Sequence, residues 1–347
     1  LKVAKSGTGA PAEYIFTITY EANGGEGKAM PVDTVYYGHD VALRSCGYTK
    51  EGYIFVEWNT SADGKGAPFK AGHSLRLDRN LVLYAQWKDN GVFTVSASKQ
   101  VKFSKGNLQY TQSTDTWSFA STQYEVLGTN NVTGGSVSFD PEQGDYNHYG
   151  NTVADKIDLF CWSTSISNFG IIDPPIVDWE KYYLGSFVDW GTNKIGNDAP
   201  NTWRTLTYDE WDYVVFKRPN ASSLCGVAQV NDVNGLILLP NDWSCPTSIT
   251  VKCGFHKELN VEAYGQYQTF TADQWSMLES TGAVFLPAAG MRWGTSISSV
   301  HGYGFYWSAT RFDSGRAFDL VFDPTGAYMS NNHYRDTGRS VRLVKDL

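Results

Sequence analysis

Charged residues are scarce in this sequence, and several kinds of segment are missing from it. Asp, Glu, Lys and Arg make up 18% of the 347 residues, the net charge is -8, and no run of basic residues occurs. Binding to nucleic acid and electrostatic attachment to anionic lipid are therefore disfavoured. No apolar run reaches the roughly 20 residues that a membrane-spanning helix needs, so we expect no transmembrane segment.

Cysteine is also sparse, with five residues and no CxxC pair. A metal-binding cysteine framework is therefore not expected. A Cys245–Cys253 bridge is one interpretation of the spacing, and mostly buried free thiols are the interpretation that we prefer.

The common catalytic and cofactor-binding motifs are absent: the sequence has no HExxH, no P-loop, no GxGxxG and no GxSxG. Its six histidines are scattered without metal-ligand spacing. Glu142, Asp145 and His148 lie close together in a Gly-rich segment, but three candidates are fewer ligands than hard metals require. We interpret this segment as a solvated loop, with a bound cation as the alternative, and expect no metal, no cofactor and no enzymatic activity.

A signal peptide is missing too, because the chain opens on the small polar stretch LKVAKSGTGAPAEY. We interpret residues 1–13 as a leader or tether from which an export signal or a lipid-bearing cysteine has been removed upstream. Aromatic residues, in contrast, are plentiful: they make up 15% of the chain, alongside 34 glycines. This composition is typical of a loop-rich, largely β protein outside the cell, and the length suits two domains.

Residues 14–88 are predicted to form the first domain. Phe16, Ile18 and Tyr20 alternate with polar residues as in a half-buried strand, and the turn Asn23-Gly24-Gly25 follows. Glycine turns and short aromatic runs continue to Trp87. This series resembles the Listeria–Bacteroides repeat, the B-repeat of internalin-type surface proteins, which implies a β-grasp-like stalk module, with ligand binding as the alternative. Glu57 departs from the glycine that is usual in that family and puts the local turn in question.

Residues 89–92 are predicted to be a linker, and residues 93–347 a second domain that is mainly β with two helices. Strands are expected at Phe93–Val95, which pairs with Val101–Phe103, and at Trp117–Phe119. The apolar runs Leu236–Leu239 and Val284–Leu286 each end at proline and are predicted to be central strands buried on both faces.

Two helices are predicted from capping boxes. In Thr207-Tyr208-Asp209-Glu210 and Thr271-Ala272-Asp273-Gln274, a threonine hydroxyl caps the first turn and the fourth side chain reaches back. Trp211 follows the first box and Trp275 the second. We expect both indoles to pack in the core and not to serve as sugar platforms.

The C-terminal stretch 305–344 combines two kinds of position. Apolar or small residues, among them Trp307, Leu320, Phe322 and Val341, are predicted to form a buried frame. Aromatic, charged and amide residues lie between them, a composition that is typical of a recognition surface, although ordinary solvated loops are the alternative. In this two-layer interpretation, Ala317, Leu320 and Phe322 belong to the frame, and Phe318, Asp319 and Val321 are expected to point outward.

The second domain resembles the C-type-lectin-like fold, in the branch of formylglycine-generating enzymes and diversity-generating-retroelement targets. It is most similar to a family of gut Bacteroidetes surface proteins. The segments that carry the resemblance are Phe103–Tyr110, Trp203–Trp211, Asn234–Trp243, Ala283–Arg292, Tyr306–Thr310 and Ser340–Val344. The enzymes require a reactive cysteine pair near the C-terminal end, which is lacking here because no cysteine follows Cys253. Retroelement targets vary solvent-facing residues at this end to change ligand.

We therefore predict a secreted or surface-attached protein, adhesin-like and attached to the outer membrane, which binds an extracellular protein or glycan. A carbohydrate-active enzyme that uses Asp313 or Asp319 is one alternative, and a structural surface or fimbrial component is another. The predicted ligand-binding residues are Trp293, His301, Tyr303, Arg311, Phe312, Asp313, Arg316, Phe318, Asp319, Tyr328, Asn331, Asn332, His333, Tyr334 and Arg335. Among them, Phe312, Phe318, Tyr334 and Arg335 are expected to be exposed together on one face.

Overall fold

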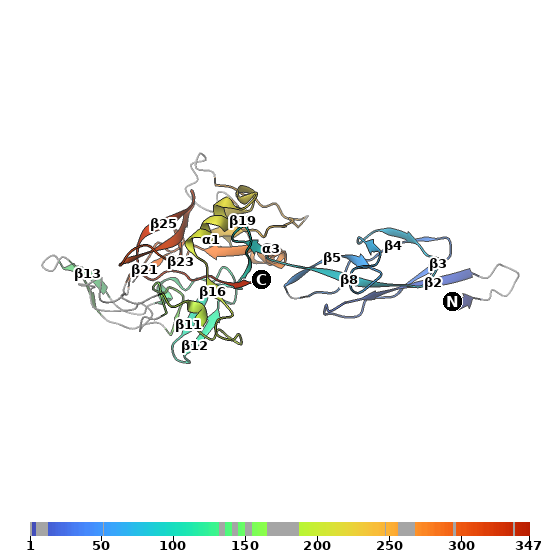
Figure 1. Cartoon of the computed structure of the whole chain (residues 1–347), viewed down its shortest axis with the longest axis horizontal. Coiled ribbons are helices and arrows are strands. Elements are labelled where there is room, and N and C mark those ends of the chain that lie inside the picture. Colours follow the sequence, from blue (N-terminus) through green and yellow to red (C-terminus); the bar gives the residue numbers. More distant parts are fainter. Residues whose placement is uncertain are drawn as a thin grey trace. The chain divides into compact units, whose positions relative to one another are not determined.

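The protein is mainly β, and its chain divides into two compact units, Leu1–Asn90 and Gly91–Leu347. The division falls within the predicted linker, residues 89–92. The computed structural model describes residues 2–4, 13–50, 52–131, 136–140, 145–149, 155–164, 187–246, 248–255, 268–293, 296–335 and 337–347 (Figure 1).

The N-terminal unit is built on one sheet, in the order β1-β2-β8-β5-β6, with β3 paired to β2. Strands β2 and β8 run parallel to each other, and β5 is antiparallel to β8. The strands are β1 (Lys2–Ala4), β2 (Glu13–Glu21), β3 (Asp33–Tyr36), β5 (Tyr53–Asn59), β6 (Pro68–Phe69) and β8 (Leu81–Asp89), with a separate pair formed by β4 (Asp40–Ala42) and β7 (Ser74–Arg76). Strand β1 lies within residues 1–13, so part of the predicted tether pairs with the sheet.

The alternation in β2 buries every second side chain, as predicted. Phe16, Ile18 and Tyr20 are all buried and pack in one apolar cluster with Trp58, which is fully buried. The departure at Glu57 does not interrupt β5. It coincides with a shift in the register between β5 and β8 that lies between Phe55 and Glu57.

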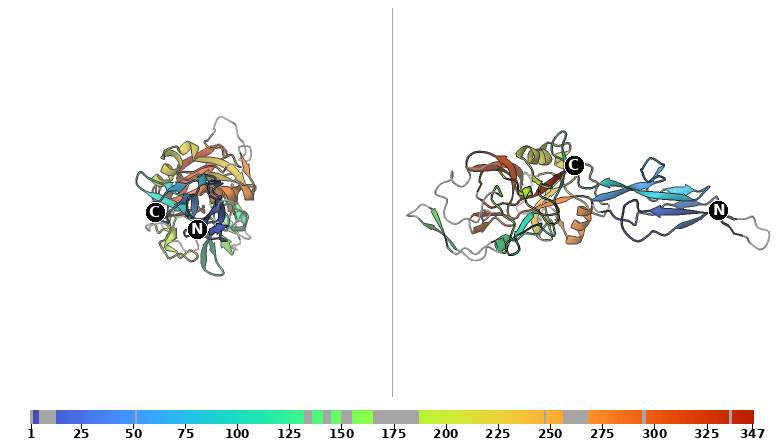
Figure 2. Two further views of the ribbon diagram at one scale, coloured as in Figure 1. Left: turned by 90° about the vertical axis from the view of Figure 1, so that its right-hand side faces the viewer. Right: turned by 60° about the horizontal axis from the view of Figure 1, so that its bottom comes forward.

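The C-terminal unit consists of several small sheets (Figure 2). One has the order β16-β26-β10-β9, a second β12-β11-β15, a third β19-β17-β18-β20 and a fourth β23-β24-β25. Their strands are β9 (Phe93–Thr94), β10 (Gln100–Phe103), β11 (Leu108–Thr111), β12 (Thr116–Phe119), β15 (Lys156–Ile157), β16 (Arg204–Thr205), β17 (Cys225–Val230), β18 (Val233–Leu238), β19 (Thr269–Phe270), β20 (Val284–Pro287), β23 (Gly304–Arg311), β24 (Arg316–Asp323), β25 (Gly326–Tyr334) and β26 (Leu343–Asp346). Two further hairpins are β13 (Ser136–Asp140) with β14 (Asp145–Tyr149), and β21 (Met291–Trp293) with β22 (Ser296–Ser298).

The predicted strands of this unit are confirmed, with one exception in their placement. β9 pairs with β10 and β12 pairs with β11, as expected from their sequences. β18 is a central strand, and all residues of β20 are buried. β20 is nevertheless the last strand in the order of its sheet, so its apolar run reflects burial and not a central position.

Both predicted helices begin at their capping boxes. Thr207 caps α1 (Tyr208–Asp212), and Thr271 caps α3 (Ala272–Ser280). α1 continues as a π-helical turn over Tyr213–Lys217, ahead of Pro219. Trp211 and Trp275 are fully buried, which confirms that both indoles belong to the core.

The frame of the C-terminal stretch separates two apolar clusters. Consecutive side chains of a strand point to opposite faces, so Tyr306 and Trp307 enter different clusters. Tyr306 packs with Leu320 and Phe322, and Trp307 packs with Val341. The predicted burial of Trp307, Leu320, Phe322 and Val341 is confirmed, since each is 0% exposed.

None of the five cysteines forms a disulfide bond, so the Cys245–Cys253 bridge is absent. Cys161 and Cys225 are buried, Cys46 and Cys253 are half-buried, and Cys245 is exposed. The preference for mostly buried thiols is therefore right for two positions and wrong for Cys245.

Candidate functional site

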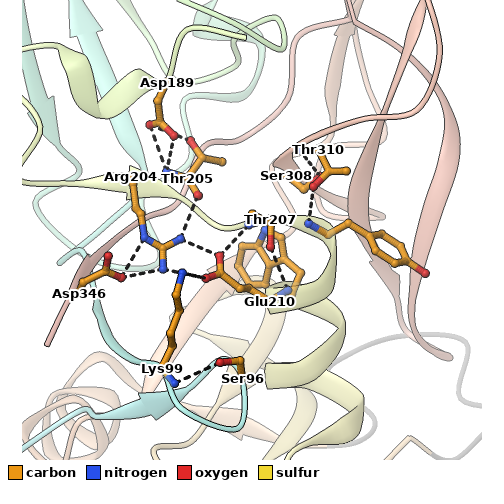
Figure 3. Close-up of polar contacts among 12 residues, drawn as sticks. Ser96, Lys99, Asp189, Arg204, Thr205, Thr207, Glu210, Ser308, Thr310 and Asp346 are labelled. Carbon is orange, nitrogen blue, oxygen red and sulfur yellow. Dashed lines mark hydrogen bonds and ion pairs between the residues drawn. The ribbon is translucent and has the colours of Figure 1, made fainter.

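A polar network around Arg204 holds α1 against the C-terminal strand (Figure 3). The guanidinium of Arg204 donates to both carboxylate oxygens of Glu210 at 2.6 and 2.9 Å and to Asp346 of β26 at 2.7 and 2.9 Å. Glu210 also completes the cap of α1, because it accepts from the amide of Thr207 at 2.9 Å. A single carboxylate thus joins the helix cap to the sheet.

The same helix is tied to β23, which borders the predicted site. The amide of Tyr208 donates to the hydroxyl of Thr310 at 2.9 Å. The indole of Trp211 donates to the backbone carbonyl of Trp307 at 3.2 Å. These contacts fix the position of the three-stranded sheet that carries most of the predicted ligand-binding residues.

Asp319 of β24 lies at the centre of a buried group of charges. Its side chain is 0% exposed and accepts from Arg339 Nη1 at 2.6 Å. His333 of β25 contacts the same carboxylate through Nδ1 at 2.9 and 3.1 Å. The guanidinium of Arg339 lies over the rings of Phe305 and Trp307, with 4.5 and 4.9 Å to the ring centroids. Buried charges persist only when they are paired in this way.

Aromatic side chains border this charge group. The buried Phe305 meets the ring of His333 edge to face at 5.6 Å and stacks on Tyr303 at 5.9 Å. Trp293 of β21 meets Tyr334 edge to face at 6.1 Å, and Tyr334 lies opposite Arg316, on the other face of the sheet from Asp319. We call Tyr303, Tyr328 and His333 the aromatic patch.

Tyr328 belongs to the patch because it lies opposite Val321 in the register of β24 and β25, on the same face as Asp319. Burial, followed by the negative charges of Asp323 and Asp319, raises the pKa of Tyr328. The phenol therefore stays protonated at neutral pH, and its hydroxyl can donate or accept a hydrogen bond. The side chain is 49% exposed, so the hydroxyl is available to a ligand.

The segment that presents Tyr303 is held by backbone hydrogen bonds. The amide of Gly290 donates to the carbonyl of Tyr303 at 2.9 Å, and the amide of His301 donates to Ala288 at 2.8 Å. Gly290 has a φ of +72°, and a Cβ there would lie 2.2 Å from the carbonyl oxygen of Ser298. Another residue type at this position would displace the turn, so the glycine is required for the placement of Tyr303.

A second aromatic group lies on the other face of the sheet, and we call it the turn cluster: Tyr208, Phe312, Arg316 and Phe318. Phe318 packs on Tyr208 of α1 at 4.4 Å and on Phe312 at 5.3 Å. Arg316 lies over the ring of Phe312 at 5.1 Å. Its guanidinium also donates to Asp313 at 2.7 Å, and this bond together with backbone amides lowers the pKa of Asp313 despite the opposing effect of burial.

The structure corrects several of the predicted site residues. Asp319 and Val321 are 0% exposed and Arg335 is 1% exposed, so none of them points outward. Asp319 is buried because Arg339 pairs with its charge and His333 forms a hydrogen bond with it. Arg335 is buried because its guanidinium packs over the ring of Trp162 at 5.3 Å.

Of the four residues expected to be exposed together, Arg335 is therefore wrong, and Phe318 is half-buried against α1. Phe318 lies on the opposite face of the sheet from His333. Phe312 and Tyr334 are 42% and 37% exposed, and Tyr334 lies opposite Arg316 in the register of β24 and β25. His301 and Arg311 are exposed, and the side chains of Asn331 and Asn332 lie outside the described residues.

Sequence reasoning missed the buried arginines. Arg292, Arg339 and Arg342 are each almost fully buried, at 0%, 1% and 0% exposed. Arg292 donates to the carbonyl of Leu159 at 2.8 Å, and Arg342 donates to Gln123 at 3.0 Å. The only sequence signal is that Arg339 and Arg342 lie among the small and apolar residues of GRSVRLV, where a solvated arginine would be out of place.

The described residues contain no cluster of three or more His, Cys, Asp or Glu side chains that could hold a metal ion. Glu142 lies outside the described residues, as do the side chains of Asp145 and His148, the other members of the predicted cation segment. Among the described residues, no helix has the length and apolar character needed to cross a bilayer.

Comparison with known proteins identifies the first unit. The family model described as the Listeria-Bacteroides repeat domain matches residues 16–86. A protein of Evansella cellulosilytica named "Putative membrane protein" is 32% identical over 79 residues, which are 22% of this chain and 12% of that protein. A second protein of the same organism, named "Putative Gly-rich membrane protein", is 38% identical over 72 residues, or 20% of this chain and 8% of that protein.

The chain therefore spans only a small part of the length of these relatives. No solved structure matches the chain. The N-terminal unit thus carries a Listeria-Bacteroides repeat, as the sequence predicted.

Proposed function

We propose that the protein acts at a bacterial cell surface and binds an extracellular protein or glycan. In this proposal the repeat of the N-terminal unit serves as a stalk, and the C-terminal unit is a C-type-lectin-like head. The match to a repeat found in surface proteins supports the location, and so do the names of the two relatives. An anchor to the outer membrane, through a lipid-bearing cysteine upstream, belongs to the same proposal.

The aromatic patch is the observation that carries the binding role. Tyr303 and Tyr328 are 40% and 49% exposed, so both present a large aromatic surface to solvent. They lie beside the charge group that includes His333, which a buried ion pair holds in place. Rigid, amphipathic aromatic side chains around a fixed polar group are typical of binding sites, because little conformational entropy is lost when a ligand binds.

Catalysis by Asp313 or Asp319 is less well supported than binding. Asp319 has no exposed surface and is committed to Arg339 and His333. Asp313 accepts the amides of Gly315 and Arg316 as well as the guanidinium of Arg316, so it organises the turn between β23 and β24. Binding without catalysis is therefore the function that we propose.

The proposal is tested by measuring the binding of immobilised glycans and extracellular matrix proteins to the full chain. We expect the double variant Tyr303→Ala, Tyr328→Ala to lose binding while its unfolding temperature stays within a few degrees of the wild type. The matched control is Tyr36→Ala, Tyr37→Ala, which removes two tyrosines of the N-terminal unit that are 48% and 64% exposed, against 40% and 49% for Tyr303 and Tyr328. Equal loss in both double variants, or in neither, would contradict the proposal.

A further inference from the structure

The hydrogen bonds of His333 determine which of its ring nitrogens carries the proton. The carboxylate of Asp319 is bonded to Arg339 at 2.6 Å, and a guanidinium remains charged in proteins, so Asp319 is ionised and can only accept. Nδ1 of His333 lies 2.9 Å from the same carboxylate. Nδ1 must therefore be the donor, and in the neutral ring Nε2 is left with a free lone pair.

The exposed part of the ring is the part that holds Nε2. The side chain of His333 is 28% exposed, and its Nδ1 edge lies against a carboxylate with no exposed surface. The ring is held on one side by the edge-to-face contact with Phe305. No described residue forms a hydrogen bond with Nε2. The imidazole is thus fixed with an acceptor directed toward solvent.

We infer that His333 accepts a hydrogen bond from the ligand, and that the ligand of the aromatic patch is a neutral, hydroxyl-rich glycan. This inference rests on the proposed function. An Nε2 without a proton can only accept a hydrogen bond, so the ligand must offer a donor. The hydroxyl groups of a sugar ring provide donors in several directions. The hydroxyls of Tyr303 and Tyr328 can donate or accept, and the aromatic faces suit the apolar C–H face of a sugar ring.

The charges around the patch argue against an anionic ligand. Arg339 is the cation beneath the patch, but it is 1% exposed and neutralised by Asp319. Asp323 lies close enough to Tyr328 to raise the pKa of its phenol, so the nearby field is negative. A sialylated or sulfated glycan, or an acidic peptide, would meet this negative charge without an exposed cation in the patch itself.

The tautomer can be tested without any ligand, by measuring the ¹⁵N chemical shifts of His333 in the full chain by NMR. We expect a protonated Nδ1 and an unprotonated Nε2 at pH 8. The opposite tautomer would overturn the inference, because the site would then present a donor. The Asp319→Asn variant gives the reference, since an amide no longer imposes Nδ1–H.

Binding is then measured on an array of neutral mannan, glucan, galactan and xylan oligosaccharides beside sialylated and sulfated ones. We expect the neutral oligosaccharides to bind and the sialylated and sulfated ones not to bind. The charged groups around the ring are Asp319 and Arg339, and the hydroxyls of Tyr303 and Tyr328 lie at the rim.

Two substitutions separate recognition from support of the fold. His333→Asn keeps an amide donor near Asp319 but has no atom at the place of Nε2, and we expect about tenfold weaker binding, the size of one lost hydrogen bond. His333→Gln places an amide near the position of Nε2 and should retain part of the binding. Unchanged affinity in both variants would overturn the inference.

The outcomes also separate this inference from the proposed function. If a protein or an anionic glycan binds through Tyr303 and Tyr328, the inference is wrong and the proposed function stands. If no glycan and no protein binds, both are wrong.

Discussion

The described residues of the N-terminal unit bury a single polar side chain, that of Asn59, whereas those of the C-terminal unit bury aspartate, glutamate and several arginines. Ion pairs of the first unit lie at the surface, as in Arg76–Asp40, whose side chains are 65% and 56% exposed. In the second unit the pair Arg339–Asp319 has almost no exposed surface. The stability of the first unit therefore depends mainly on the burial of apolar side chains. The stability of the second unit also requires that each of its buried charges has a partner.

This comparison predicts its largest effect for Arg339→Met. The substitution leaves Asp319 buried without its cation, and we expect a loss of about 3–5 kcal/mol in the free energy of unfolding. Hydrogen exchange of the full chain would locate the effect: amides of β23, β24 and β25 should lose protection, while those of β2, β5 and β8 keep it. The double variant Arg339→Met, Asp319→Leu removes both charges and should recover most of the stability. Loss of protection in both units would contradict the view that only the C-terminal unit depends on buried ion pairs.

The second prediction concerns pH. Burial raises the pKa of Asp158 to about 6, against an unfolded value of about 3.9. The folded protein therefore holds this proton more tightly than the unfolded chain, so the contribution to stability is fully present below about pH 4 and is lost as the pH rises through 6. The loss amounts to at most about 3 kcal/mol.

Asp158→Asn resembles the protonated acid and should remove this pH dependence, as measured by urea unfolding between pH 4 and 7. Glu125 provides the matched control with the opposite sign. Burial raises its pKa, but hydrogen bonds from Gln109 and Ser121 prevail and lower it to about 2. Its own contribution is present above about pH 4.3 and is lost as the pH falls toward 2. Because the charge of Glu125 also helps to raise the pKa of Asp158, Glu125→Gln should reduce the pH dependence between pH 4.5 and 7 without removing it.

A smaller effect is expected at the helix caps, which belong to the C-terminal unit. The hydroxyl of Thr207 accepts from the amide of Glu210, and that of Thr271 accepts from Gln274, each at 3.2 Å. Replacing either threonine by alanine should cost about 1 kcal/mol, and serine should restore most of it. Thermal unfolding of the four variants would measure this, and an alanine variant as stable as the wild type would mean that water replaces the cap at no cost.

The smallest effects are predicted for the exposed tyrosines of both units. Tyr37 is 64% exposed and Tyr328 49% exposed. Replacing either by alanine should change the free energy of unfolding by less than about 0.5 kcal/mol, because little apolar surface is lost from a core. Urea unfolding would test this, and a cost above 2 kcal/mol for Tyr328 would mean that the aromatic patch supports the fold instead of serving recognition.

The sequence predicted those features whose cause is local. The capping boxes at Thr207 and Thr271 span four residues each, and the alternation of Phe16, Ile18 and Tyr20 follows directly from strand geometry. The turns and aromatic runs of the repeat could be recognised for the same reason, since they recur at short spacing.

The parts that could not be predicted depend on partners far away in the chain. A charged residue such as Asp319 is expected to point outward when its partner is not known. Its partner, Arg339, contacts it only in the folded sheet. β24 alternates regularly from Ala317 to Asp319, so Phe318 faces the other side, but its register against β25 shifts there. Ser330 and His333 consequently lie opposite Asp319 and Ala317, on one face, although they are three residues apart. A pattern with a period of two cannot show an irregularity in the neighbouring strand.

Strand β26 has a consequence for the order in which the protein is made. It lies between β10 and β16, and it pairs Val344 with both Phe103 and Arg204. Leu343 and Val344 also belong to the two apolar clusters of the C-terminal unit. On the ribosome, the strands of the N-terminal unit emerge together and can pair at once. The C-terminal unit must wait for residues 343–346, and until they leave the exit tunnel its apolar surfaces remain open to chaperones.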